Sequence, residues 1–235
     1  MGTQATAKFE GFYPETLEFL REVRANNSKA WFEERRPEYE RVLLEPMRAL
    51  VGELGGFMLA VDPRLEVRPA VGKTISRIFR DTRFSKDKSL FRSNMWCSFR
   101  RAFQEWEDTP SFFFEINPDE YCYGMGFYLA SRPTMAAFRK RLDTQPEQFL
   151  EAIRPLGSGY FELEGEQYRK PLGPAKPPEL AAWYQRKNFY LIRYGRPGAT
   201  LFSAELVREL LDGLERAVPL YHYLWETVAA RDASA

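Results

Sequence analysis

Positive charge concentrates in one stretch of the chain, from Lys73 to Arg101. This stretch holds nine Lys or Arg residues and two Asp residues, a local balance of +7, so the rest of the chain carries −6 to give the net charge of +1. Arginine grips a phosphate or carboxylate with a rigid two-pronged fork, whereas lysine supplies a mobile point charge. A segment that mixes the two is typical of a site for an anionic ligand.

The candidate ligand-binding residues lie within this stretch. They are Arg77, Arg80, Asp81, Arg83, Ser85, Lys86, Asp87 and Lys88. If residues 75–80 are extended, Arg77 and Arg80 point to opposite sides, because side chains alternate along a strand. The loop that follows would therefore have to fold back to place its cations beside either arginine.

Three functions stay open for this stretch. The leading one is binding of a small anionic, phosphorylated ligand or substrate, with Glu115 and Trp31 as weaker candidate neighbours. The second is a nucleic-acid backbone binding module, which the aromatic residues Phe84, Phe91 and Trp96 among the cations favour. The third is a structural or protein-interaction domain without a ligand.

Acidic residues of the same chain could neutralise the cations of the basic stretch by forming ion pairs with them. Residues 102–131 contain six acids and no Lys or Arg, and Asp81 or Asp87 could hold Arg80 or Arg83 locally. The six acids are Glu105, Glu107, Asp108, Glu115, Asp119 and Glu120.

Histidine and cysteine chemistry is nearly excluded by number and position. His222 is the only histidine, and Cys97 and Cys122 fall in strand-like segments without metal-ligand spacing. The carboxylates also lack such spacing, and no glycine-rich phosphate loop follows a strand. We therefore predict no metal and no cofactor, and whether the protein is an enzyme stays open.

The elements that must position this stretch form an α+β pattern. We predict helices at residues 14–25, 133–142, 146–153 and 203–228, and strands at residues 95–101, 112–116, 121–129 and 188–193. We also predict a helix that Ser28 caps, that Pro37 interrupts, and that resumes as far as Leu54 with a bend or break at Pro46. Extended segments at residues 67–71 and 75–79 lead into the basic stretch. A run of strands between helices is typical of a mainly antiparallel sheet packed with N-terminal and C-terminal helices.

Glycine and proline mark the expected boundaries. Gly55 and Gly56 should end the long N-terminal helix, and residues 154–178 should form an irregular connection. In the strand at residues 121–129, Gly124 and Gly126 share a face, where we expect a helix to approach the sheet more readily than a ligand. We predict one domain over residues 1–235, with residues 1–10 disordered.

Composition indicates a globular protein, with 44% hydrophobic and 29% charged residues. No apolar run reaches the length of a membrane span, and the N-terminus lacks the apolar core of a secretory signal. We therefore expect a cytoplasmic protein with no membrane partner, and the oligomeric state stays open.

Four stretches of the sequence form a distinctive set that extends along nearly the whole chain: GFYPETLEFLREVRANNSKAWFEERRPEYE, RIFRDTRFSKDKSLFRSN, YGMGFYLASR and YQRKNFYLIR. Together they resemble a family of conserved hypothetical proteins, the domain-of-unknown-function family numbered 2461. The resemblance implies a shared fold and a shared basic centre, and it assigns no activity, substrate or cofactor. The residues of that centre here are Arg77, Arg80, Asp81, Arg83, Phe84, Ser85, Asp87 and Lys88.

The chain departs from the family's pattern just after this centre. Members often continue with Pro-Tyr-Lys-Thr and then His or Asn, whereas this chain has Leu90, Phe91, Arg92, Ser93 and Asn94. A histidine at the last position therefore takes no part in any chemistry of this protein.

Overall fold

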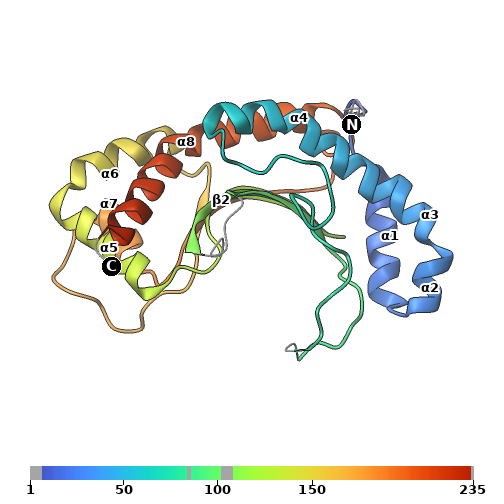
Figure 1. The fold of residues 1–235 in the computed structure, drawn as a ribbon, viewed down its shortest axis with the longest axis horizontal. Helices are drawn as coiled ribbons and strands as arrows, with labels where there is room; N and C mark the ends of the chain where they lie inside the picture. Colours follow the sequence, from blue (N-terminus) through green and yellow to red (C-terminus); the bar gives the residue numbers. More distant parts are fainter. Residues whose placement is uncertain (1–6, 84–85, 102–107, 234–235) are drawn as a thin grey trace. The chain divides into compact units, whose positions relative to one another are not determined.

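The N-terminal part of the chain is helical. The computed structural model describes residues 7–83, 86–101 and 108–233 (Figure 1). Its first elements are α1 (Pro14–Ala25), α2 (Lys29–Glu34), α3 (Arg36–Tyr39), the π-helical turn η1 (Glu40–Leu44) and α4 (Glu45–Val61). Pro14 opens α1, and the Ser28 side chain accepts a hydrogen bond from the backbone N–H of Trp31, which caps α2.

The predicted end of the long N-terminal helix at Gly55 and Gly56 is wrong, since α4 continues to Val61. Leu54 and Met58 are both fully buried, four residues apart on one face of the helix. Burial of that face outweighs the low helix propensity of two glycines, which amounts to about 1 kcal/mol each.

Five strands form an antiparallel sheet in the order β1-β2-β3-β5-β4. They are β1 (Met95–Phe99), β2 (Pro110–Ile116), β3 (Tyr121–Phe127), β4 (Glu162–Glu164) and β5 (Tyr190–Gly195). The four predicted strands correspond to β1, β2, β3 and β5. The sequence analysis missed β4, which pairs with β5 from within the supposedly irregular connection. The extended segments predicted at residues 67–71 and 75–79 form isolated bridges instead of strands.

The later helices confirm the α+β class. They are α5 (Arg132–Thr144), α6 (Pro146–Ile153), the short 3-10 turn η3 (Arg154–Leu156), α7 (Pro178–Tyr184) and α8 (Glu205–Asp232). Only η3 and α7 were not expected. Among the residues that the structure describes, none of these helices combines the length and the apolar character needed to cross a membrane.

The chain forms two compact units. The first contains residues 1–99, 113–123 and 194–211, and the second contains residues 100–112, 124–193 and 212–235. In the first unit Phe9 is buried and packs edge-to-face on Phe12, which stacks on Phe114. Phe9, which lies in the range predicted to be disordered, is therefore part of the packed core, while residues 1–6 lie outside the described residues. In the second unit Phe138, Phe149 and Phe189 belong to an aromatic core.

The glycine face of β3 lies against backbone of β5, so the expected helix is not what approaches it. A Cβ atom added at Gly124 would lie 1.8 Å from the carbonyl oxygen of Leu191, and one added at Gly126 would lie 2.4 Å from the Cα atom of Tyr190. Both glycines are required because no side chain fits between the two strands.

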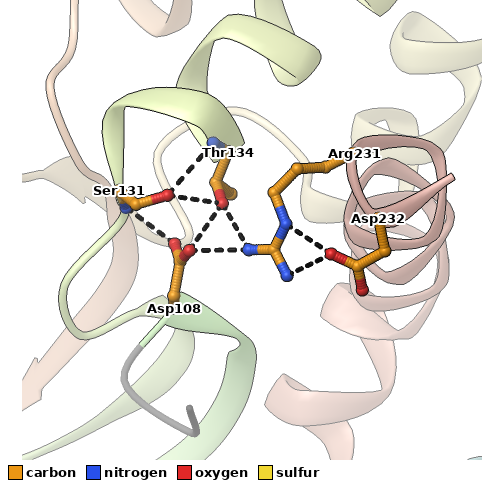
Figure 2. Close-up of polar contacts among 5 residues, drawn as sticks. All are labelled: Asp108, Ser131, Thr134, Arg231 and Asp232. Atoms are coloured by element: carbon orange, nitrogen blue, oxygen red, sulfur yellow. Dashed lines mark hydrogen bonds and ion pairs between the residues drawn. The ribbon is translucent and has the colours of Figure 1, made fainter. Parts of the chain in front are cut away.

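A polar network in the second unit joins the start of α5 to the end of α8 (Figure 2). Asp108 accepts hydrogen bonds from the backbone N–H of Ser131 and the hydroxyl of Thr134, at 2.7 and 2.8 Å. It also pairs with the guanidinium of Arg231 at 2.6 Å, while Asp232 binds the other side of that guanidinium at 2.7 Å. The Arg231 and Asp108 side chains are only 11% and 18% exposed, whereas Asp232 is 54% exposed.

The close approach of β3 and β5 predicts that the effect of a glycine-to-alanine substitution on the free energy of unfolding depends strongly on its position. Gly124→Ala should lower the free energy of unfolding by about 3 kcal/mol, because the added methyl group collides with backbone that cannot rotate away. Gly56→Ala is the control, since a Cβ atom at Gly56 meets nothing within 4 Å. It should raise the free energy of unfolding by about 0.5–1 kcal/mol. Urea denaturation measures both, and equal effects would contradict the prediction.

The polar network predicts that one of the two aspartates on Arg231 stabilises the fold far more than the other. Asp108→Ala should cost about 2–3 kcal/mol, because it removes the part-buried counter-charge of the Arg231 guanidinium and leaves the Ser131 N–H without its acceptor. Asp232→Ala should cost less than about 0.5 kcal/mol, since its ion pair is exposed. Thermal or urea unfolding tests this ranking, and a larger loss for Asp232→Ala would refute it.

Candidate functional site

Most of the basic stretch folds back on itself in the first unit as a hairpin closed by an isolated antiparallel bridge between Phe79 and Phe91; we call it the basic hairpin and define it as residues 76–92. The backbone N–H of Arg80 donates to the carbonyl of Leu90, and that of Arg92 donates to the carbonyl of Ile78, both at 2.8 Å. At its base, the N–H of Ser76 donates to the carbonyl of Trp96 in β1. In Figure 1 the basic hairpin extends away from β1.

Aromatic packing against α2 holds the basic hairpin. The ring of Phe91 stacks on Phe32 with centroids 4.3 Å apart and contacts Phe79 at 4.8 Å. Asn27, just before α2, accepts a hydrogen bond from the Phe91 N–H at 3.0 Å and donates its amide to the Phe91 carbonyl at 2.8 Å. The far half of the hairpin is therefore presented from a fixed base.

Two ion pairs lie within the basic hairpin, as the local-pairing alternative predicted. Arg80 pairs with Asp87 at 3.2 Å and Arg83 pairs with Asp81 at 2.7 Å. Hydrogen bonds from the Arg83 side chain and backbone lower the pKa of Asp81 to about 2. The pKa of Asp87 is lowered chiefly by hydrogen bonds from Ser89. Both aspartates are therefore charged at neutral pH and oppose two of the arginines.

The other predicted site residues do not join these pairs. Arg77 and Lys86 are exposed, and no described residue gives either of them an ion pair or hydrogen bond. Lys88 donates its ammonium group to the carbonyl of Thr82 at 2.8 Å. Ser85 lies outside the described residues, as does Phe84. The structure thus brings together Arg80 with Asp87 and Arg83 with Asp81, and it leaves Arg77 apart from both pairs.

Three of the six acids of residues 102–131 have partners outside the basic hairpin. Asp108 binds Arg231, Asp119 pairs with Arg24, and Glu115 accepts a hydrogen bond from Asn94. Glu105 and Glu107 lie outside the described residues. The described parts of the neighbouring strands therefore do not account for neutralisation of the hairpin, which retains an excess of positive charge.

Glu115 is the more notable of the two weaker candidates. The amide of Asn94 donates to its carboxylate at 2.9 Å. Burial raises the pKa of Glu115, the Asn94 hydrogen bond lowers it, and the nearby negative charge of Glu120 raises it again. Trp31, the other candidate, stacks on Phe19 and lies under the guanidinium of Arg35, so its recorded contacts are with the helices rather than the hairpin.

One contact at the base of the hairpin was missed by the sequence analysis. Arg92 donates to the carbonyl of Phe79 at 2.8 Å and places its guanidinium carbon 5.1 Å from the ring centre of Trp96. Arg92 lies before β1 and is separated from it by a bend at Ser93, so strand periodicity gave no signal for its contact with Trp96.

Cys97 and Cys122 are buried and not bridged, and burial raises the pKa of the Cys97 thiol to about 12. In the described part of the chain no group of three His, Cys, Asp or Glu residues could hold a metal ion. His222 is exposed on α8.

The environment of Glu115 predicts a pH-dependent effect of neutralising it. The Glu115 carboxyl group binds its proton more tightly in the folded protein than in the unfolded chain. Loss of that proton therefore lowers the free energy of unfolding as the pH rises from about 4.5 through the raised pKa of Glu115. Glu115→Gln should therefore gain stability relative to the parent as the pH increases from 4 to 7. The exposed Glu18→Gln serves as the control. Melting temperatures across this range that move in parallel for all three proteins would contradict the assignment.

The comparisons with known proteins agree with the resemblance seen in the sequence. Residues 15–223 match the family described as conserved hypothetical protein (DUF2461), which is most of the chain. No match was found among curated proteins. The family's description names no activity, so the site has to be interpreted from its own geometry. On the extent of this match, the chain belongs to the DUF2461 family of conserved hypothetical proteins.

Proposed function

We propose that the basic hairpin binds the phosphate groups of an extended polyanion, such as the backbone of a single-stranded nucleic acid. The observation that carries the proposal is that the same hairpin carries both exposed cations and exposed apolar side chains. Arg77 and Lys86 are exposed, while Phe79 and Leu90 are 46% and 43% exposed. Cations follow a phosphate backbone and aromatic faces stack with bases, so this combination suits a nucleic acid better than a bare phosphate.

The two ion pairs of the hairpin are compatible with such a ligand. The Arg83 and Asp81 side chains are 77% and 55% exposed, and Asp87 is 54% exposed. Exposed ion pairs contribute about 0–1 kcal/mol, so an incoming phosphate can take the place of the aspartate at small cost. Arg80 and Arg83 then become available in addition to Arg77.

A small phosphorylated ligand is the second candidate, and one observation favours it. The Nε–H of Arg80 is buried and has no acceptor among the described residues, while the ion pair to Asp87 uses its Nη1 atom. A compact phosphate in place of Asp87 would offer several oxygens to this guanidinium. Either class of ligand is available in the cytoplasm, the location expected from the sequence.

Binding of a labelled single-stranded oligonucleotide, followed by fluorescence anisotropy, tests the first candidate. If the hairpin makes three or four phosphate contacts, the logarithm of the association constant should fall with the logarithm of salt concentration at a slope of about −2 to −3. The double variant Arg77→Ala with Lys86→Ala should weaken binding and make that slope shallower by about 1.4, because two phosphate contacts are lost.

The matched control replaces the exposed Arg132 and Lys140 of α5 with alanine, which removes the same charge elsewhere. Equal weakening by the two double variants would reject the hairpin as the site. If the oligonucleotide does not bind but nucleotides or sugar phosphates do, and Arg80→Gln abolishes that binding, the second candidate replaces the first. Absence of binding to either class would leave a structural or protein-interaction role.

A further inference from the structure

Two arginines in the second unit meet at one aromatic ring. Tyr160 precedes β4, Arg193 lies in β5 and Arg216 lies in α8, so the three residues come from distant parts of the sequence. The guanidinium carbons of Arg193 and Arg216 lie 4.3 and 4.6 Å from the ring centre of Tyr160. The two cations therefore cannot lie farther apart than the sum of these distances, about 9 Å.

Neither of these guanidiniums is neutralised by the described part of the protein. Arg193 donates from Nη1 to the carbonyl of Tyr160 at 3.1 Å, and its buried Nε has no acceptor. Asp212 and Glu215 lie close to Arg216 in the sequence of α8, yet no described carboxylate forms an ion pair with Arg216 or Arg193. Two like charges near one ring repel each other, and contact with the ring compensates only part of this.

Other arginines of the same unit have a structural role, in which the guanidinium donates several hydrogen bonds to backbone carbonyls. Arg139 donates to the carbonyls of Met135, Tyr184 and Arg186. Arg186 donates to the carbonyls of Leu163 and Gly165. Both make several hydrogen bonds to backbone carbonyls, although the buried Nε of Arg186, like that of Arg193, has no acceptor among the described residues. Arg193 makes a single hydrogen bond of this kind, and exposed Arg216 makes none with the described residues.

The loop before Tyr160 leaves space beside Arg216. Gly157 and Gly159 have φ angles of +69° and +73°, a conformation that favours glycine. A Cβ atom at Gly157 would meet only an Nη atom of Arg216, at 3.9 Å, so this guanidinium lies next to the loop backbone. The segment from Arg154 to Phe161 contains no acidic residue. Nothing in this loop therefore competes with an external anion for the two arginines.

We propose that Arg193, Arg216 and Tyr160 form a binding site for a small oxyanion of the phosphate class, either free or as part of a larger ligand. Guanidinium forks bind phosphate oxygens in pairs, and one phosphate between two arginines would turn their repulsion into attraction. The ring of Tyr160 keeps both forks close together. This site belongs to the second unit, is separate in sequence from the basic hairpin of the first, and does not rest on the function proposed for the hairpin.

Isothermal titration of the full chain with pyrophosphate, at constant ionic strength set by chloride, tests this site. The parent should show saturable binding with one site, and Arg216→Gln should weaken it about tenfold, as expected for the loss of a charged hydrogen-bonding partner. Arg216 is exposed, so the variant should fold as the parent does. Calorimetry is preferred to thermal shifts because phosphate-like salts stabilise proteins without a specific site.

Two controls separate this site from other cations. Arg208→Gln removes an exposed arginine from the same helix and should bind pyrophosphate as the parent does. The Arg77→Ala with Lys86→Ala variant should also bind as the parent does, whether or not the hairpin binds nucleic acid. The proposal is overturned if the parent shows no saturable binding, if Arg216→Gln binds as tightly as the parent, or if the hairpin variant removes the binding.

Discussion

The basic hairpin depends on one contact at its base, where the amide of Asn27 meets the backbone of Phe91. The two hydrogen bonds of that amide, together with the stack of Phe91 on Phe32, fix the hairpin to the start of α2. Without that attachment the cations would lie on a freely moving loop, and ordering them around a ligand would cost conformational entropy. With it, the hairpin presents Arg77 and Arg80 from a base that is already folded.

Arginine serves three different purposes in this chain. Arg139 and Arg186 satisfy carbonyl groups where helices and strands end. Arg231 of α8 forms an ion pair with Asp108 and donates a hydrogen bond to Thr134 of α5, so it connects these two helices. Arg193 and Arg216 gather at Tyr160 without a described counter-charge. Total net charge, which is close to zero, hides these differences, because it averages paired and unpaired groups.

Patterns that act over short distances in the sequence were predictable. The α+β class and the strands around Met95 and Tyr121 follow from periodicity, and local pairing of the hairpin's aspartates with its arginines follows from neighbouring charges. Features set by distant contacts were not. The passage of α4 through Gly55 depends on burial of Leu54 and Met58, and the approach of β5 to the glycines of β3 depends on strands that are far apart in the chain.

The candidate sites divide in the same way. The basic hairpin could be identified from the sequence because its cations lie within one short stretch. The sequence did not reveal which of these cations are paired with aspartates. The cluster at Tyr160 could not be found, since β4 itself was missed and its pairing with β5 brings Tyr160 beside Arg193. A site assembled from three separate segments has no local pattern to recognise.

The two edges of the sheet have consequences for self-association. At one edge β4 is only three residues long, Glu162–Glu164, and carries a carboxylate at each end. At the other edge the backbone of residues 74–76 is hydrogen bonded to β1. Short, charged or covered edges deny a second chain the row of free backbone groups on which intermolecular strands grow. The sheet therefore carries its own protection against amyloid-like aggregation during expression and storage.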